Sequence, residues 1–251
     1  MFQLTHTRRI AVLTMQHGKA NALDTEFCNA LAAKFDELKA SDARAVVITG
    51  QGKIFSAGVD LLRATTSGVD YFKHFLPALA KLYMSAFFLS KPLVAAVNGH
   101  AVAGGCILAA CADRRLMARG EGRIGVTELL VGVPFPPLAF EIMRFASAPK
   151  YFPEIIYTGA TFPPEEALAR GLIDEIVAPE QLVELAVAAA EKLGALRPEA
   201  FALTKQQMRQ PVADALERHG QRVAAATAAV WLAPETFASM RDYVSRTFKK
   251  S

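Results

Sequence analysis

Residues 98–113 read NGHAVAGGCILAACAD, and this stretch decides how the middle of the chain folds. It follows a short apolar run, LVAAV at 93–97, and leads through Gly104 and Gly105 into a run that is apolar on every side. A buried strand that turns into a buried helix explains this order. Glycines at the turn leave the first N–H groups of the helix uncovered, so a ligand oxygen could approach them. Close packing of strand against helix explains a lone glycine pair better.

The composition of the 251 residues is that of an ordinary globular protein, with 52% hydrophobic and 21% charged residues. The net charge is +4, and the sequence contains no run of five or more like charges. A mild positive excess without a basic stripe favours an anionic small ligand over nucleic acid. The three cysteines form no CxxC pair and are predicted to be reduced core residues. The histidines lack metal-ligand spacing, so we expect no metal site.

The segment 92–112 contains no charged residue and is long enough to be weighed as a membrane span. Its proline, asparagine and many small residues favour a buried strand, turn and helix instead. The first fifteen residues, MFQLTHTRRIAVLTM, show no apolar segment before a small-residue cleavage site. We therefore expect a strand here rather than an export signal, and a cytoplasmic protein with no membrane contact.

Hydrophobic periodicity predicts an α/β core followed by helices. The expected strands are 10–15, 45–49, 93–97 and 115–118, and the expected helices are 23–40, 69–89 and 163–173. Asp24 or Thr25 can cap the first of these helices, and Pro77 is expected to kink or restart the second. The α/β core is expected to reach about residue 195, with a helical part over 196–251.

A second glycine-containing loop, GKIFSAGVDLL at 52–62, follows the predicted strand 45–49. By itself it is a plain turn. Two such loops, each following a buried strand, suggest more if the strands are neighbours in one sheet. One N–H from each loop could then converge on a single oxygen and form an oxyanion hole. Losing one donor of such a hole costs about 3–4 kcal/mol of transition-state stabilisation.

A candidate base lies in RIGVTELLVGVPFPP at 123–137. Glu128 stands there among valines and leucines, whereas a surface glutamate usually has polar neighbours. This context suggests a partly buried carboxylate that serves as a general base. A glutamate held in a salt bridge or capping a helix is an equally good explanation from these residues alone.

Together these three segments resemble the crotonase (enoyl-CoA hydratase/isomerase) superfamily, and the match runs along nearly the whole chain. The residues that carry the resemblance are KANALD at 19–24, IFSAGVDL at 54–61, NGHAVAGG at 98–105, CAD at 111–113 and TGATFPPEEALARGLIDEIV at 158–177. Each motif is moderately specific, and their order and spacing together are strongly so.

The resemblance implies an α/β fold, a crotonase-like spiral of ββα units over 1–195, with a helical trimerisation region over 196–251. It implies an acyl-CoA thioester as substrate, with no separate cofactor because coenzyme A is part of that substrate, and a homotrimer or a dimer of trimers. The thioester carbonyl would accept hydrogen bonds from the amides of Val59 and Gly104, with Glu128 as the base. The residues matching the segments that contact coenzyme A include Lys19, Ala20, Ala57 and Leu61.

One position departs from the family's hydratases, which carry a second catalytic glutamate three residues beyond the second oxyanion glycine. This chain has Ile107 there. Water addition divides its proton transfers between two carboxylates, whereas one carboxylate can move a proton from C2 of a 3-enoyl thioester to C4. The segments 124–137 and 202–210 also resemble single-glutamate Δ3,Δ2-enoyl-CoA isomerases more than hydratases. The sequence therefore favours an isomerase of fatty acid metabolism.

Three alternatives stay open. A hydratase could use His100 to position water, and a CoA-thioester hydrolase could use Glu128 to activate water against the carbonyl. A protein with this fold could also be an RNA-binding or scaffold subunit without enzymatic activity. The acyl preference is also open, because Phe72, Phe75, Phe87 and Phe135 could wall an acyl pocket or simply belong to the core.

Overall fold

The computed structural model describes residues 1–248, and their strands form two sheets. The larger sheet has the order β1 (Phe2–Thr7), β2 (Ile10–Met15), β3 (Ala45–Gly50), β5 (Leu93–Val97), β7 (Arg114–Ala118) and β10 (Glu175–Val177). The smaller has the order β4 (Ile54–Ser56), β6 (His100–Val102), β8 (Ile124–Gly125) and β9 (Thr161–Phe162). Only β1–β2 and β8–β9 pair antiparallel among these neighbours.

The chain winds between the two sheets as a spiral. β3, β5 and β7 of the larger sheet are each followed by a strand of the smaller sheet, which are β4, β6 and β8, and then by a helix. Each of these turns is a ββα unit, so the predicted spiral is confirmed. Because every turn adds its strands parallel to the previous ones, the loops that follow β4 and β6 lie at the same end of the smaller sheet.

The helices are α1 (Thr25–Ala40), α2 (Leu61–Ser67), α3 (Val69–Phe87), α4 (Gly104–Ala110), α5 (Glu128–Val131), α6 (Pro137–Ala146), α7 (Phe152–Thr158), α8 (Pro164–Ala169), α9 (Leu182–Gly194), α10 (Pro198–Ala215), α11 (Gln221–Trp231) and α12 (Pro234–Phe248). A short 3₁₀ turn (Pro179–Gln181) precedes α9, and a π-helical turn (Leu216–Gly220) joins α10 to α11.

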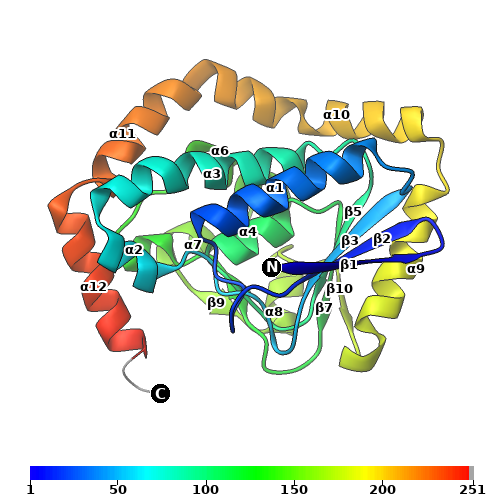
Figure 1. Ribbon diagram of the computed structural model, residues 1–251, viewed down its shortest axis with the longest axis horizontal. Helices are drawn as coiled ribbons and strands as arrows, with labels where there is room; N and C mark the ends of the chain where they lie inside the picture. Colours follow the sequence, from blue (N-terminus) through cyan, green and yellow to red (C-terminus); the bar gives the residue numbers. More distant parts are fainter. Residues whose placement is uncertain (249–251) are drawn as a thin grey trace.

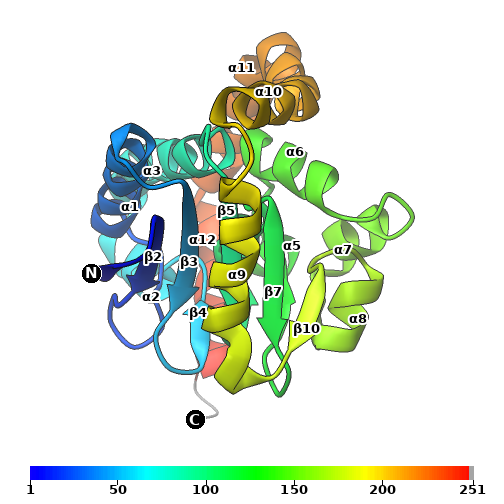
Figure 2. The same ribbon diagram turned by 90° about the vertical axis from the view of Figure 1, so that its right-hand side faces the viewer.

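Both faces of the larger sheet are covered, which is why β3 and β5 are continuous apolar runs. Val47 and Val94 face α9, which crosses the sheet in Figure 2, and they pack with Ala186 and Ala190 of that helix. The alternate side chains, such as Ile48, belong to the main core with α1 and α3. Because successive side chains of a strand point to opposite faces of the sheet, each strand contributes alternate side chains to two different cores.

The structure corrects one half of the expectation about Pro77, the restart of the helix, while the kink stays a prediction. α3 runs unbroken from Val69 to Phe87 through this proline, so the helix does not restart there. Proline removes one helical hydrogen bond. The buried side of α3, which includes Phe72, Phe75 and Leu79, evidently outweighs that loss by packing into the core.

The aromatic residues left open by the sequence belong to the core. Phe72, Phe75 and Phe87 are fully buried and Phe135 is nearly so. The three cysteines are free and buried, as predicted.

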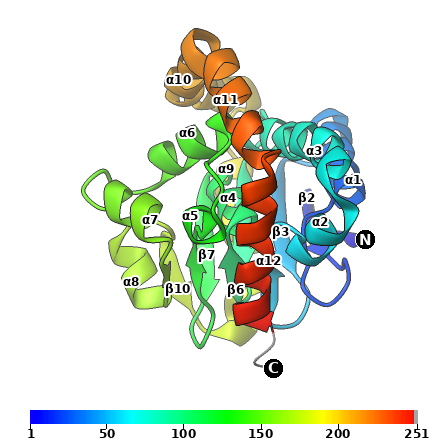
Figure 3. The same ribbon diagram turned by 90° about the vertical axis from the view of Figure 1, so that its left-hand side faces the viewer.

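After Gly194, helices α10, α11 and α12 wrap back over the core (Figure 1). Figure 3 shows α12 crossing in front of the sheets, and it contacts both α2 and α5. The last helices therefore pack on the same chain, and their role in trimerisation stays a prediction. No helix within residues 1–248 is both long and apolar enough to cross a membrane.

Candidate active site

The two glycine loops meet at the ends of β4 and β6. These strands are parallel neighbours, with Ser56 opposite Ala101. A Cβ atom built on Gly58 would lie only 2.5 Å from the carbonyl oxygen of Val102 and 2.9 Å from the amide nitrogen of Gly104. Gly58 also has a φ of +79°. Only glycine permits both this backbone conformation and this contact between loops.

The glycine pair of the second loop is closely packed. A Cβ atom on Gly105 would lie 2.3 Å from the carbonyl oxygen of Ser56, so this glycine is required for packing of α4 against β4. Gly104 lies on the wall of a cavity. There the hydroxyl of Tyr83 donates to the Gly104 carbonyl at 3.0 Å and fixes the start of α4. A Cβ atom on Gly104 would lie 2.8 Å from the Tyr83 hydroxyl and 2.9 Å from Leu23 Cδ1, so close packing explains both glycines, and the approach of a ligand oxygen to the Gly104 amide stays a prediction.

Val59 is held in place by the segment before α1. The amide of Leu23 donates to the carbonyl of Gly58 at 2.7 Å, and the amide of Asp60 donates to the carbonyl of Leu23 at 3.0 Å. The N–H of Val59 between them donates to no atom of residues 1–248, and neither does that of Gly104. Both residues line the same cavity. The structure thus brings together the two amides that the sequence singled out.

Ala103 turns the peptide that carries the Gly104 N–H. Its φ is +50° and its ψ is −122°, a conformation that a residue with a side chain rarely adopts. The Ala103 amide donates to the carbonyl of Gly125 at 2.8 Å, and its carbonyl accepts from the amide of Ile107 at 3.2 Å. These two hydrogen bonds hold the strained backbone of Ala103 in place, and such strained backbone conformations are typical of functional loops.

Glu128 is the first residue of α5 and is only 6% exposed. Its Oε2 atom has no hydrogen-bond partner among residues 1–248, and the ion pairs found there do not include it. Burial raises the pKa of this carboxyl group to about 7, although hydrogen bonds with the backbone of Glu128 and Thr127 partly oppose the rise. The salt-bridge explanation is therefore wrong, whereas the backbone hydrogen bonds at the first turn of α5 agree with the capping explanation, and the role of Glu128 as a base stays a prediction.

One cavity of about 550 Å³ joins these features. Its walls include Val59, Gly104, Ile107 and Glu128. Three of the four residues assigned to coenzyme A also line it, namely Ala20, Ala57 and Leu61, whereas Lys19 is exposed outside the cavity. His100 lines it too.

The C-terminal helices also contribute to this cavity, which the sequence did not indicate. Trp231 ends α11, and Tyr243 and Thr247 come from α12, and all three line the cavity. They stand more than a hundred positions from Glu128 in the chain. The only available signal was that Trp231, the single tryptophan, ends an alanine-rich segment.

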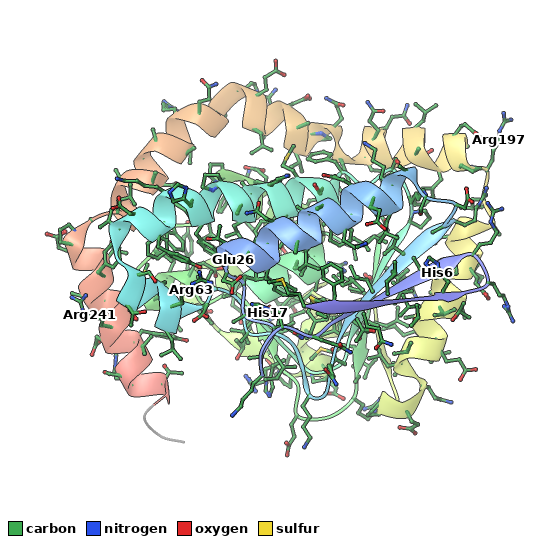
Figure 4. The ribbon with its side chains drawn as sticks, in the orientation of Figure 1. His6, His17, Glu26, Arg63, Arg197 and Arg241 are labelled. Carbon is green, nitrogen blue, oxygen red and sulfur yellow. The ribbon has the colours of Figure 1, made fainter. Side chains whose placement is uncertain are left out.

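A charged cluster fixes the start of α1 beside α2. Figure 4 shows His17, Glu26 and Arg63 close together. Arg63 of α2 donates to both oxygens of Glu26 at 2.6 and 2.7 Å, and lies 3.2 Å from Asp24. The Nε2 atom of His17 lies 2.8 Å from Asp24, and its ring stacks on Phe27. This cluster holds the loop that pairs with Val59.

The spiral of ββα units followed by C-terminal helices is the crotonase fold. The comparison with known families agrees. The family model described as enoyl-CoA hydratase/isomerase matches residues 5–236, and the chain belongs to this family. It is therefore an enzyme of the enoyl-CoA hydratase/isomerase family.

Some of the individual relatives are named isomerases and others are named hydratases. The mitochondrial enoyl-CoA delta isomerase 1 of Rattus norvegicus is 30% identical over 210 residues, which are 82% of this chain and 73% of that protein. The structure of human mitochondrial delta3-delta2-enoyl-CoA isomerase superposes with a TM-score of 0.93 at 25% identity, covering 100% of this chain and 99% of that one. The structure of enoyl-CoA hydratase EchA3 from Mycobacterium ulcerans superposes with a TM-score of 0.83 at 30% identity, covering 90% of this chain and 98% of that one.

Proposed function

We propose that this protein is a Δ3,Δ2-enoyl-CoA isomerase with Glu128 as its single acid–base group. The observation that carries the proposal is the unpartnered carboxylate of Glu128, which shares one cavity with the aliphatic Ile107 and the two free amides. A pKa of about 7 suits a group that must both accept and return a proton near neutral pH.

The reaction moves one proton and one double bond. The Glu128 carboxylate removes a proton from C2 of a 3-enoyl-CoA thioester, and the electron pair of that C–H bond forms a dienolate. The negative charge on the thioester oxygen is stabilised by the N–H groups of Val59 and Gly104. The protonated Glu128 then returns its proton at C4, which leaves the double bond between C2 and C3 and regenerates the carboxylate.

Ile107 supports isomerisation over hydration. It is buried and faces the same cavity as Glu128, so no second carboxylate stands at that position to share the proton transfers of water addition. Asp60, the other carboxylate on the wall, caps α2 by accepting from the amide of Arg63 at 2.9 Å. Hydration is the second candidate, because His100 also lines the cavity and is the residue there that would position water.

The rest of the proposal concerns the substrate and the assembly. The coenzyme A portion would lie at the mouth of the cavity, against the backbone of Ala20, Ala57 and Leu61, with Lys19 outside. We propose a homotrimer or a dimer of trimers, supported by exposed apolar side chains on α10 such as Leu203 and Met208, each 62% exposed. Light scattering would give the mass of the assembly.

The test supplies purified protein with a 3-enoyl-CoA and, separately, a 2-enoyl-CoA, and separates the products by chromatography. We expect conversion of the first to the 2-enoyl isomer and no 3-hydroxyacyl product from the second. Glu128→Gln should lose turnover and keep thioester binding, as measured by calorimetry. Efficient hydration of the 2-enoyl-CoA would contradict the proposal, and loss of that hydration in His100→Ala would support the second candidate.

A further inference from the structure

A second, largely apolar cavity that opens to solvent lies next to the active-site cavity, with the exposed Lys73 on its wall. It has a volume of about 440 Å³ and is formed by α3, by the start of α6 and by α11. Its walls include Phe72, Leu76, Pro77, Ala228 and Leu232. Pro136 lines both cavities, so they are neighbours. Figure 3 shows α11 descending toward this region from α10.

Two aromatic rings in series separate the cavities. Trp231 lines the active-site cavity and is 2% exposed. Its ring centroid lies 5.3 Å from that of Phe72, which is fully buried and lines the second cavity. The indole is also fixed, because its Nε1 atom donates to the carbonyl of Pro134 at 2.9 Å. A side chain held by a hydrogen bond and by ring packing forms a firm wall.

An acyl tail in this cavity must run past Glu128 along the apolar walls, of which Trp231 is one. Glu128 has to reach C2 and C4 of the substrate, so the carbons beyond C4 extend past it, away from the thioester. Leu79, Val131, Val133 and Ala139 line the cavity with apolar surface suited to such a tail, and Trp231 also borders it. Each methylene buried in such a site is worth about a four-fold gain in kcat/KM.

We propose that Trp231, backed by Phe72, closes the acyl subsite and limits the chain length of the substrate. The second cavity is an apolar extension that the tail reaches only when this wall is removed. The proposal rests on the proposed function, since it places an enoyl-CoA thioester in the first cavity.

The experiment measures kcat/KM for 3-enoyl-CoA thioesters from about six to sixteen carbons. The ratio of long-chain to short-chain values within one variant is independent of the fraction of active enzyme. In the wild type we expect this ratio to fall beyond a limiting length. Trp231→Ala should move that limit to longer chains, by about four-fold per added methylene that enters the second cavity. Trp231→Phe, which keeps a ring, should shift it less.

Two further variants make the test specific. Ala228→Trp should fill the second cavity and cancel the gain when combined with Trp231→Ala. Phe237→Ala removes another buried ring that packs on Phe72, at 5.5 Å, yet Phe237 lines neither cavity. It should lower stability and leave the length profile unchanged.

A Trp231→Ala enzyme with wild-type length dependence would overturn the inference while the proposed function stands. Binding of saturated acyl-CoA thioesters, measured by calorimetry, gives the same length profile without turnover. If no 3-enoyl-CoA is isomerised but the binding limit still moves in Trp231→Ala, the proposed function fails and the wall is supported. If the binding limit does not move either, both proposals fail.

Discussion

At the scale of single residues, the chemistry of this site follows from what surrounds Glu128. The sequence indicated a buried carboxylate because valines and leucines flank it, and the structure confirms the burial. The sequence could not show that Oε2 is buried without a hydrogen-bond partner within residues 1–248, or that Glu128 lines the same cavity as Val59 and Gly104. Trp231 escaped prediction altogether, because its place beside the site depends on the whole path of the C-terminal helices.

The pH dependence of turnover should report the ionisation of Glu128. Burial raises the pKa of this group from 4.5 to about 7, and the base acts in its ionised form. We therefore expect kcat/KM for a 3-enoyl-CoA to rise with pH and to reach a plateau above about pH 7. A profile already flat from pH 5 would show that the free enzyme has no such group.

The same shift predicts an effect on stability. Between pH 4.5 and about 7 the folded protein holds a proton that the unfolded chain has released, so the free energy of unfolding falls as pH rises through this window. Glu128→Gln should remove this loss and be more stable than the wild type at pH 8, by at most about 3 kcal/mol. Urea unfolding at pH 5 and pH 8 checks this, and equal pH dependence in both proteins would contradict it.

A carboxylate at position 107 should add hydration to the activity. Ile107→Glu places a second acid–base group on the wall that Glu128 shares, as in the hydratases that the chain resembles. We expect a measurable 3-hydroxyacyl product from 2-enoyl-CoA and slower isomerisation, because a second buried carboxylate disfavours ionisation of the first. Ile107→Gln is the matched control, and equal hydration by both variants would rule out proton transfer by the new carboxylate.

At the scale of elements, prediction succeeded where an element carries its own signal. β3 and β5 are apolar runs that are buried throughout, and α1 has both a cap and a periodic apolar side. The smaller sheet gave no such signal, since β6 has three residues and β8 has two. Strands this short show no periodicity, and only pairing with neighbours defines them. Yet this sheet is what aligns the two loops.

The N-cap of α1 links an element to the site. Asp24 accepts from the amide of Phe27 at 2.7 Å, and it follows Leu23, whose backbone holds the Val59 loop. Asp24→Ala should lower the free energy of unfolding by about 1–2 kcal/mol, because it loses the cap and its contacts with His17 and Arg63. Asp24→Asn keeps the cap and should lose less. Chemical denaturation measures both, and equal losses would show that the cap contributes nothing.

At the scale of the whole molecule, α10 is tied to the spiral by a buried group of charges. Lys205 Nζ and Arg209 Nη2 of α10 each donate to Asp113 at 2.6 Å, and Asp113 also accepts from the amide of Leu93. The sequence showed CAD at 111–113 and a helical segment around 202–210 but not that they pair, because a contact between such distant positions has no local pattern. This pairing sets where α11, and with it Trp231, comes to lie over the site.

Because two buried cations share one carboxylate, substitutions in this charged group should lower the folding stability by unequal amounts. Asp113→Asn leaves both cations without a counter-charge and should cost about 3–5 kcal/mol of folding stability. Lys205→Met leaves the Arg209–Asp113 pair intact and should cost less. Burial lowers the pKa of Lys205 from 10.5 to about 8, more than the pairing with Asp113 raises it.

Above about pH 8 the unfolded chain therefore keeps a proton that the folded protein has released, so this group makes the free energy of unfolding rise with pH. Lys205→Met should lack this contribution, and the difference between the two proteins should grow from about pH 8 to 9.5. Denaturation across this range measures the difference. A constant difference would mean that Lys205 stays protonated in the folded protein and that its pairing with Asp113 outweighs its burial.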